Sequence, residues 1–190
     1  KLGNCPYFLH GDAKSPKPTT EVTYITFRND PIFRGTLEGS SPGKLAESVR
    51  WACVGFSAAA WHLMEMVGVP NILDVWCPPV TAATLMRVRI DKLYRGHAKQ
   101  VANAIWGSGV GVYGGKMVIV VDKDIDIHDD EAINWALSYR FNPEMDQLLT
   151  FPGCIGSGLD PSVPLSLRDM TRFCQGKWTR VLIDATINWE

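Results

Sequence analysis

The chain has 190 residues, of which 46% are hydrophobic and 21% are charged, and its formal net charge is −1. This composition is typical of a soluble globular protein, and the length is enough for one sizeable core. The near-zero charge argues against a nucleic-acid partner or an anionic membrane surface, and no apolar run approaches the roughly 20 residues of a membrane helix.

The first 42 residues have the pattern of a segment that belongs to a larger unit. Residues 1–20 are rich in Gly and Pro and are expected to form a loop, whereas residues 21–27, EVTYITF, alternate and favour a strand. Residues 29–31 predict a turn, and residues 32–37 a partner strand. A lone pair of strands is barely stable, so we expect residues 1–42 to be the tail of something larger.

A long helix is predicted next. Ser41 is a suitable cap and Pro42 a suitable first helical residue, and Gly68 is suited to close the C-terminal end. One apolar stripe runs along this helix at three- and four-residue steps: Leu45, Val49, Ala52, Cys53, Phe56, Ala60, Leu63, Met64 and Val67. Trp51 and Trp61 lie off the stripe, which predicts a second buried face against another domain or subunit.

The remainder alternates between strands and helices. Strands are predicted at 72–77, 84–90, 117–121, 147–151 and 178–184, and helices at 97–106 and from Asp130 to Arg140 with Asp129 as its cap. The unbroken apolar run at 117–121 indicates a strand covered on both faces, whereas Arg87 and Arg89 indicate a less buried strand at 84–90. Residues 152–164 are expected to form a Gly/Pro/Ser loop. This alternation predicts a layered α/β domain from about residue 43 onward.

Two groups of residues are candidates for chemistry. Residues 109–114 match GxGxxG, but a helix precedes them and a strand follows, so a tight connection is favoured over a phosphate site. Asp122, Asp124 and Asp126 suit either a divalent cation, an acid/base pair, or the solvation and capping of a strand end, and the last is favoured.

The histidines and cysteines offer no clear catalytic arrangement. His10, His62, His97 and His128 are isolated in sequence and are expected to be capping or surface residues. The five cysteines lack the spacing of a zinc site, and Cys53 is expected to be a core residue. Reduced cysteines and the lack of a recognisable secretion signal favour the cytoplasm. Because the chain begins with Lys1, we expect it to be a fragment or a processed chain.

Five segments, in order, resemble the C-terminal half of the UbiD-type, prenylated-FMN-dependent decarboxylases. They are EVTYITFRNDPIF at 21–33, GHAKQVANAIWG at 96–107, KMVIVVDKDIDIHDDEAINWALSYRFNP at 116–143, LDPS at 159–162 and TRVLIDAT at 179–186. LDPS and the hydrophobic spacing are most similar to members that act on hydroxybenzoates. The resemblance implies that residues 1–42 end a flavin-binding split β-barrel, that 43–69 form a connecting helix, and that 70–190 form the C-terminal α/β domain.

The resemblance also implies a reaction: the reversible, non-oxidative decarboxylation of an aromatic or α,β-unsaturated carboxylic acid. Prenylated FMN acts as the electron sink in that family, with a divalent metal (Mn or Mg) and potassium at its phosphate. The family's arginine and glutamates belong upstream of Lys1 or match no acidic residue here, so no catalytic, cofactor-binding or metal residue is assigned to this chain. The resemblance implies pocket-wall positions at Val54 and Leu159.

The resemblance further implies a homo-oligomer, dimeric or hexameric, and a flavin prenyltransferase that supplies the cofactor. The alternative is a non-catalytic, stand-alone assembly or regulatory module of the same fold. The sequence leaves the substrate acid, the direction of reaction, the oligomer size and the metal undetermined.

Overall fold

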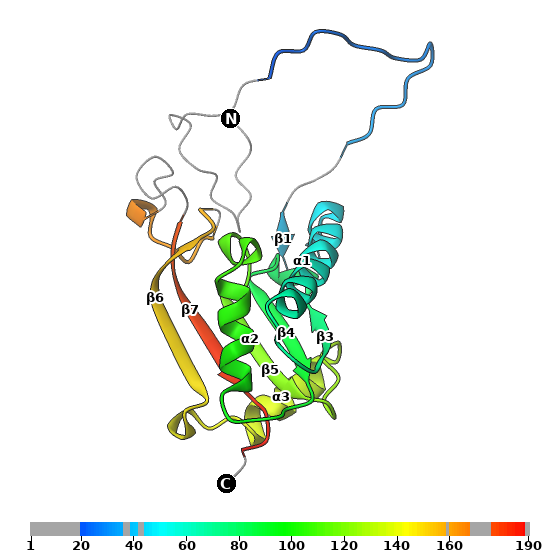
Figure 1. Ribbon diagram of the computed structural model, residues 1–190. Helices are drawn as coiled ribbons and strands as arrows, with labels where there is room; N and C mark the ends of the chain where they lie inside the picture. Colours follow the sequence, from blue (N-terminus) through cyan, green and yellow to red (C-terminus); the bar gives the residue numbers. More distant parts are fainter. Residues whose placement is uncertain (1–19, 36–38, 42–43, 159, 168–175, 189–190) are drawn as a thin grey trace.

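A computed structural model describes residues 20–35, 39–41, 44–158, 160–167 and 176–188. Its centre is a five-stranded mixed sheet with the strand order β3-β4-β5-β7-β6 (Figure 1). The strands are β3 (Ile72–Trp76), β4 (Leu85–Ile90), β5 (Met117–Asp122), β6 (Leu148–Gly156) and β7 (Gly176–Asp184). β4, β5 and β7 are parallel, and β3 and β6 pair antiparallel at the two edges.

The central position of β5 explains its sequence. Every β5 residue after Met117 is buried, because strands flank it on both sides and helices cover both faces. Val118 and Val120 point into the core beneath two helices, α1 (Glu47–Met66) and α2 (His97–Trp106). Ile119 and Val121 point into a second core, which α3 (Asp130–Tyr139) covers. The prediction of a layered α/β domain is therefore confirmed.

Short elements connect these layers. Two-residue strands β1 (Ser40–Ser41) and β2 (Lys44–Leu45) pair antiparallel before α1. Among the described residues, single turns of 3₁₀-helix follow at Pro79–Thr81 (η1), Gly109–Val112 (η2), Pro143–Met145 (η3) and Leu165–Leu167 (η4). Within the described ranges, no helix has the length and apolarity needed to cross a membrane.

Helix α1 begins later than predicted but ends where expected. Pairing of β1 with β2 replaces the helical turn predicted from Ser41, and Glu47 is the first helical residue. At the other end Gly68 has a left-handed φ of 79°. The N–H of Gly68 donates to the carbonyl of Glu65 at 3.0 Å, and that of Val69 to Met64 at 2.9 Å. This is a Schellman motif, which satisfies the last carbonyls of the helix.

The strand predicted at 21–27 is not formed. Residues 20–35 have no regular strand pairing with any other described residue and run as an extended segment away from the domain in Figure 1. Their large apolar side chains, from Val22 to Phe33, are 68% to 95% exposed. A strand requires a partner edge, and sequence alternation cannot show whether the same chain provides one. Of the predicted partner strand at 32–37, residues 32–35 are also irregular and 36–37 lie outside the described residues.

Two strands differ from prediction in burial or length. β4 is a buried strand, because the Arg87 guanidinium donates to the Ile127 carbonyl at 2.9 Å and pairs with Asp130 at 2.6 Å. β6 continues five residues into the predicted loop. A bulge between Phe151 and Cys154 absorbs Pro152 and Gly153, after which pairing with β7 resumes.

His97 is a core residue rather than the predicted cap or surface residue. Its side chain is fully buried, and Tyr94 stacks on the ring at 4.7 Å between centroids. Nε2 lies 3.0 Å from the Pro70 carbonyl, and the backbone N–H of Leu93 donates to Nδ1 at 3.4 Å. These partners fix a neutral ring with its proton on Nε2. Burial lowers the pKa of His97, although the Pro70 carbonyl acts in the opposite direction.

This burial predicts a pH dependence of stability. Because the pKa of His97 is lower in the folded chain than the ordinary value of 6.5, the unfolded chain binds the proton more readily. The contribution of neutral His97 to the free energy of unfolding is complete above pH 6.5, and it is lost as the pH falls toward the pKa of His97 in the folded chain. We expect the melting temperature to fall between pH 7.5 and 5.5, and to fall less in His97→Gln. His62→Gln, at an exposed position of α1, should retain the wild-type slope. An unchanged slope in His97→Gln would contradict the assignment.

Candidate functional site

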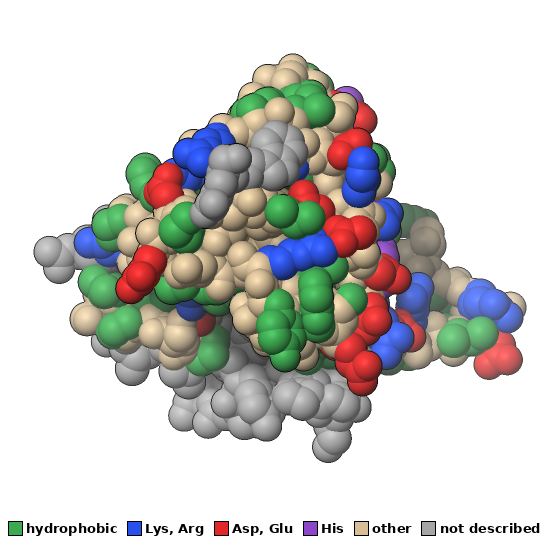
Figure 2. Space-filling view, turned by 90° about the horizontal axis from the view of Figure 1, so that it is seen from below, with side chains coloured by type: hydrophobic (Ala, Val, Ile, Leu, Met, Phe, Trp, Pro, Cys, Tyr) green, Lys and Arg blue, Asp and Glu red, His purple; other side chains and the backbone are tan. Residues whose placement is uncertain are grey.

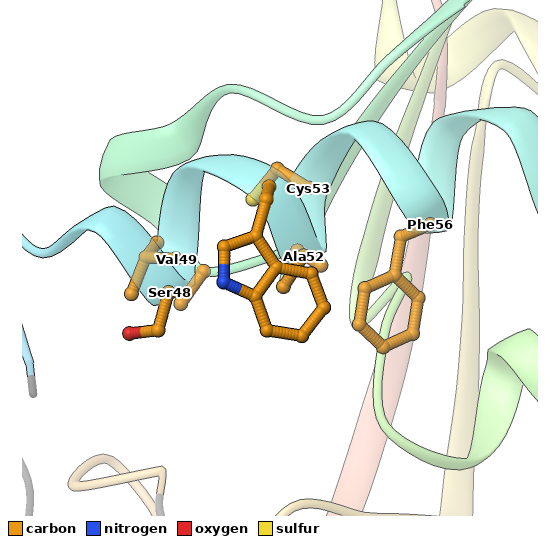
Figure 3. A pocket seen from close by; sticks show the side chains of 8 residues that line it. Ser48, Val49, Ala52, Cys53 and Phe56 are labelled. Carbon is orange, nitrogen blue, oxygen red and sulfur yellow. The ribbon is translucent and has the colours of Figure 1, made fainter. Parts of the chain in front are cut away.

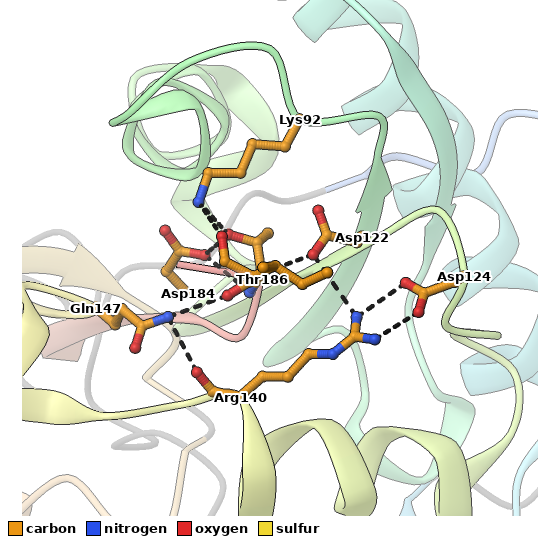
Figure 4. A network of polar contacts seen from close by, with 8 residues as sticks. Lys92, Asp122, Asp124, Arg140, Gln147, Asp184 and Thr186 are labelled. Carbon is orange, nitrogen blue, oxygen red and sulfur yellow. Dashed lines mark hydrogen bonds and ion pairs between the residues drawn. The ribbon is translucent and has the colours of Figure 1, made fainter. Parts of the chain in front are cut away.

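The carboxyl ends of parallel strands are the usual ligand site of an open α/β sheet, and here a polar network occupies them (Figure 4). Arg140 pairs with Asp124 through both carboxylate oxygens and lies 3.6 Å from Asp122. Asp122 also accepts the Ile187 N–H at 2.6 Å. Burial raises the pKa of Asp122, whereas hydrogen bonding from Arg140 lowers the pKa of Asp124.

The same network continues at the carboxyl end of β7, where Asp184 is the last residue of the strand. Asp184 accepts from the N–H of Thr186 at 3.0 Å and from its hydroxyl at 2.6 Å. Lys92 donates to the Thr186 hydroxyl at 2.8 Å, and Gln147 to the Thr186 carbonyl at 3.2 Å. These groups satisfy one another, so the network ties the ends of β5, β6 and β7 together. These contacts are consistent with the structural role favoured for Asp122 and Asp124 from sequence, and that role stays a prediction.

The third aspartate of the candidate group, Asp126, also has a protein partner. Asp126 accepts the backbone N–H of His128 at 2.9 Å, which is a turn-capping contact. Among the described residues, no group of three His, Cys, Asp or Glu side chains is placed to hold a metal. The pocket at this end is small, about 140 Å³, and its Lys99 is paired with Asp146. Figure 2 views this end from below and shows acidic and basic side chains interspersed over it.

A larger, apolar pocket lies at the opposite end, beside the amino end of β4 (Figure 3). Its volume is about 270 Å³. Helix α1 contributes one wall and the β3–β4 connection the other, and the lining residues are Ser48, Val49, Trp51, Ala52, Cys53, Phe56, Ala82 and Ala83. None of the described residues that line the pocket is charged. The pocket is therefore suited to an apolar ring or chain rather than to an ion.

The first turns of α1 explain why this pocket is open. Val49, Ala52 and Phe56 belong to the apolar stripe predicted from sequence, yet they are only partly buried. Deeper along the same stripe, Cys53, Ala60 and Met64 are fully covered. Cys53 forms part of the pocket floor, and burial raises the pKa of its thiol. Trp51 is 71% exposed at the rim, whereas Trp61 packs partly against the core and donates to Glu65.

The two residues predicted to line a substrate pocket have different outcomes. Val54 lies on α1 one turn after Trp51, is 60% exposed, and is not part of the pocket lining. Leu159 lies outside the described residues. Both assignments stay predictions. Sequence analysis did not predict that Phe56, Ala82 and Ala83 line a pocket. Phe56 could have been suggested by its place in the apolar stripe of the helix, whereas no sequence pattern marks the two alanines.

The segment after Leu159 is anchored near the amino end of β5. Lys116, which precedes β5, pairs with Asp160 at 2.7 Å, and Asp160 also accepts the Ser162 N–H at 2.8 Å. Burial would raise the pKa of Asp160, but Lys116 and Ser162 outweigh it, so the pKa is lowered. Next to Lys116, Gly115 donates its N–H to the Ala83 carbonyl of the pocket wall at 2.9 Å. The apolar pocket and Asp160 therefore lie at the same end of the sheet, beside the amino ends of β4 and β5.

The glycine-rich loop at 109–114 is a tight connection, as favoured from sequence. A Cβ on Gly111 would lie 2.7 Å from the backbone oxygens of Ile105 and Trp106, at the end of α2. The buried guanidinium of Arg180 donates to the carbonyls of Gly111 and Gly114. A phosphate site presents N–H groups to an anion, whereas this loop presents carbonyls to a cation.

Comparison with known proteins places this fold in a family. The family model of the 3-octaprenyl-4-hydroxybenzoate carboxy-lyase C-terminal domain matches residues 52–185. A protein of Archaeoglobus fulgidus without a described function is 33% identical over 176 residues, which are 92% of this chain and 33% of that protein. The chain thus spans about a third of the length of this relative.

Two solved structures share the fold. The UbiD-class enzyme HmfF from Pelotomaculum thermopropionicum, in complex with FMN, is 25% identical with a TM-score of 0.64, over 76% of this chain and 29% of HmfF. The vanillic acid decarboxylase of Sedimentibacter hydroxybenzoicus, in its open form, is 26% identical with a TM-score of 0.64, over 76% of this chain and 28% of that one. On the family match, the chain belongs to the UbiD family and contains its C-terminal domain.

Proposed function

We propose that this chain is the C-terminal part of a decarboxylase that uses prenylated FMN to remove carbon dioxide reversibly, without oxidation, from an aromatic or α,β-unsaturated acid. The observation that carries the proposal is the family match over residues 52–185 together with an open apolar pocket. Within the complete enzyme, the pocket would form one wall of the substrate site. Its apolar lining would hold the unsaturated part of the acid and exclude water from it.

The described residues do not fit the flavin itself. A flavin phosphate needs a metal with its ligands or converging N–H groups. The described ranges contain no metal-ligand cluster, and the glycine loop directs carbonyls toward Arg180. The flavin, a divalent metal (Mn or Mg) and potassium would therefore be held by other parts of the complete enzyme. The FMN bound to HmfF supports a flavin as the cofactor class.

The extended segment at 20–35 supports the proposed domain division. Its exposed apolar side chains fit a strand that completes a sheet elsewhere, as expected if residues 1–42 end a flavin-binding barrel. Helix α1, within the proposed connector 43–69, would then join that barrel to the domain at 70–190. A homo-oligomer, a flavin prenyltransferase as cofactor supplier and a hydroxybenzoate-like substrate belong to the same proposal. The similarity to a vanillic acid decarboxylase favours that substrate class.

The test is reconstitution with prenylated FMN. We expect the 190-residue chain to elute from gel filtration without the flavin, whereas the complete enzyme should retain it at one per chain by its visible spectrum. The complete enzyme should then release carbon dioxide from at least one of a panel of hydroxybenzoic and α,β-unsaturated acids. Stoichiometric co-elution of the flavin with the 190-residue chain would contradict the proposal that other parts of the complete enzyme hold the cofactor. A flavin-loaded enzyme inactive on the whole panel would favour the alternative, a non-catalytic assembly or regulatory module.

A further inference from the structure

Two successive alanines in the pocket wall have a backbone conformation that alanine seldom adopts. Ala82 has a φ of 48° and a ψ of 44°, and Ala83 has a φ of 62°. The left-handed region is unfavourable for residues with a Cβ, and only Gly, Asn and Asp adopt it readily. The other non-glycine residues with positive φ among the described ranges are Asn71 and Asp146, which are tolerant types.

Hydrogen bonds on both sides hold this turn in place. The N–H of Ala82 donates to the Pro79 carbonyl at 3.1 Å, and the N–H of Gly115 donates to the Ala83 carbonyl at 2.9 Å. The hydroxyl of Thr81 donates to the Pro78 carbonyl at 2.7 Å, and that of Thr84 to the Thr81 carbonyl at 2.6 Å. The surroundings therefore impose the conformation. Glycine would adopt it without steric cost, so each of the two alanine methyl groups carries a local conformational penalty.

Both alanines line the apolar pocket, opposite the α1 wall that includes Val49, Ala52 and Phe56. We propose that the left-handed Ala82–Ala83 turn determines the size of the ligand that this pocket accepts, namely the planar ring of a small aromatic acid. An apolar cavity of about 150 Å³ is enough to bind benzene, and this pocket has about 270 Å³. The inference rests on the proposed function, because it assigns the acid's ring to this pocket.

Ala82→Gly separates the two effects of the methyl group. The substitution relieves the strain of the left-handed backbone, so we expect the melting temperature to rise by about 1–3 °C. It also removes one methyl group from the pocket wall. Loss of one methyl contact should weaken the binding of benzoate about threefold. The space gained should strengthen the binding of 4-methylbenzoate. The preference for 4-methylbenzoate over benzoate should therefore increase at least about threefold. Ala82→Asn, which tolerates the same backbone and adds polar bulk, should weaken both ligands about tenfold.

Asn71→Gly is the matched control, because Asn71 also has a left-handed backbone but lies outside the pocket lining. It should leave the ratio of the two dissociation constants unchanged. The measurement is a titration of the 190-residue chain with benzoate and with 4-methylbenzoate, followed by the methyl NMR signals of Val49, Ala82 and Ala83. Each dissociation constant comes from the shift of the methyl signals that remain in each variant.

The outcomes separate this inference from the proposed function. If both ligands shift the pocket methyl signals, Ala82→Gly changes the ratio, Ala82→Asn weakens both ligands and Asn71→Gly changes neither, the inference holds. If both ligands bind but Ala82→Gly leaves the ratio at the wild-type value, the turn does not determine size, and the pocket-wall function stands. If neither ligand shifts these signals, both the inference and the assignment of the ring to this pocket are overturned.

Discussion

Gly111→Ala should lower the free energy of unfolding by about 3 kcal/mol or more, among the largest effects that one methyl group can produce here. The new Cβ would lie 2.7 Å from two carbonyl oxygens and 2.9 Å from the Cα of Trp106. All three atoms belong to the backbone at the end of α2, so no side chain can rotate away. A shift of the loop would also disturb the hydrogen bond from Arg180 to the Gly111 carbonyl.

Gly109→Ala is the matched control for this prediction, because a Cβ at Gly109 meets no atom within 4 Å. Urea unfolding followed by circular dichroism should give a control midpoint close to that of the wild type and a much lower midpoint for Gly111→Ala. Equal midpoints for the two variants would show that the connection between α2 and β5 is loose. A tight connection explains why a GxGxxG pattern occurs here without the strand-loop-helix order of a nucleotide site.

If the complete protein is the proposed decarboxylase, Ala52→Met should lower its kcat/KM about 10- to 100-fold, because the longer side chain would occupy the pocket and displace the acid from its reacting position. Ala52 lines the pocket from α1 and is only partly buried. Met is a good helix former, so the melting temperature should change little. The expected loss is therefore selective for turnover.

Ala58→Met provides the control on the same helix. Ala58 is exposed and does not line the pocket, so the same substitution should leave kcat/KM within about twofold of the wild-type value. The measurements are kcat/KM from steady-state kinetics and the melting temperature from thermal unfolding, for both variants. If Ala52→Met retained full activity, the acid would bind elsewhere and the pocket would have another role.

Features encoded by neighbouring residues were predictable from the sequence. The bounds of α2, the Asp129 cap of α3 and the Gly68 end of α1 follow from local capping chemistry and helical periodicity. The buried run of β5 likewise showed its central place in the sheet. Each of these signals is complete within about ten residues, so it does not depend on how distant parts of the chain meet.

The remaining features depend on distant partners. The sequence around Arg87 predicts a surface residue, because its partners Ile127 and Asp130 are about 40 residues away along the chain. His97 is likewise predicted as a capping residue, because the contact of its ring with the Pro70 carbonyl depends on the tertiary fold. The open pocket also joins two distant segments, because Ala82 and Ala83 meet α1 only through tertiary packing. Alanine gives no sequence signal for a left-handed backbone, so this wall of the candidate site could not be predicted.

The exposed segment at 20–35 has a consequence for handling and synthesis of the protein. Residues 22–27, VTYITF, combine β-branched and aromatic residues with no charge and no proline, which is the signature of segments that stack into cross-β fibrils. As long as these exposed side chains stay in water, they can nucleate aggregation. The shelf life of a concentrated sample, and the yield from an expressing cell, would then depend on how soon another polypeptide surface covers these six residues.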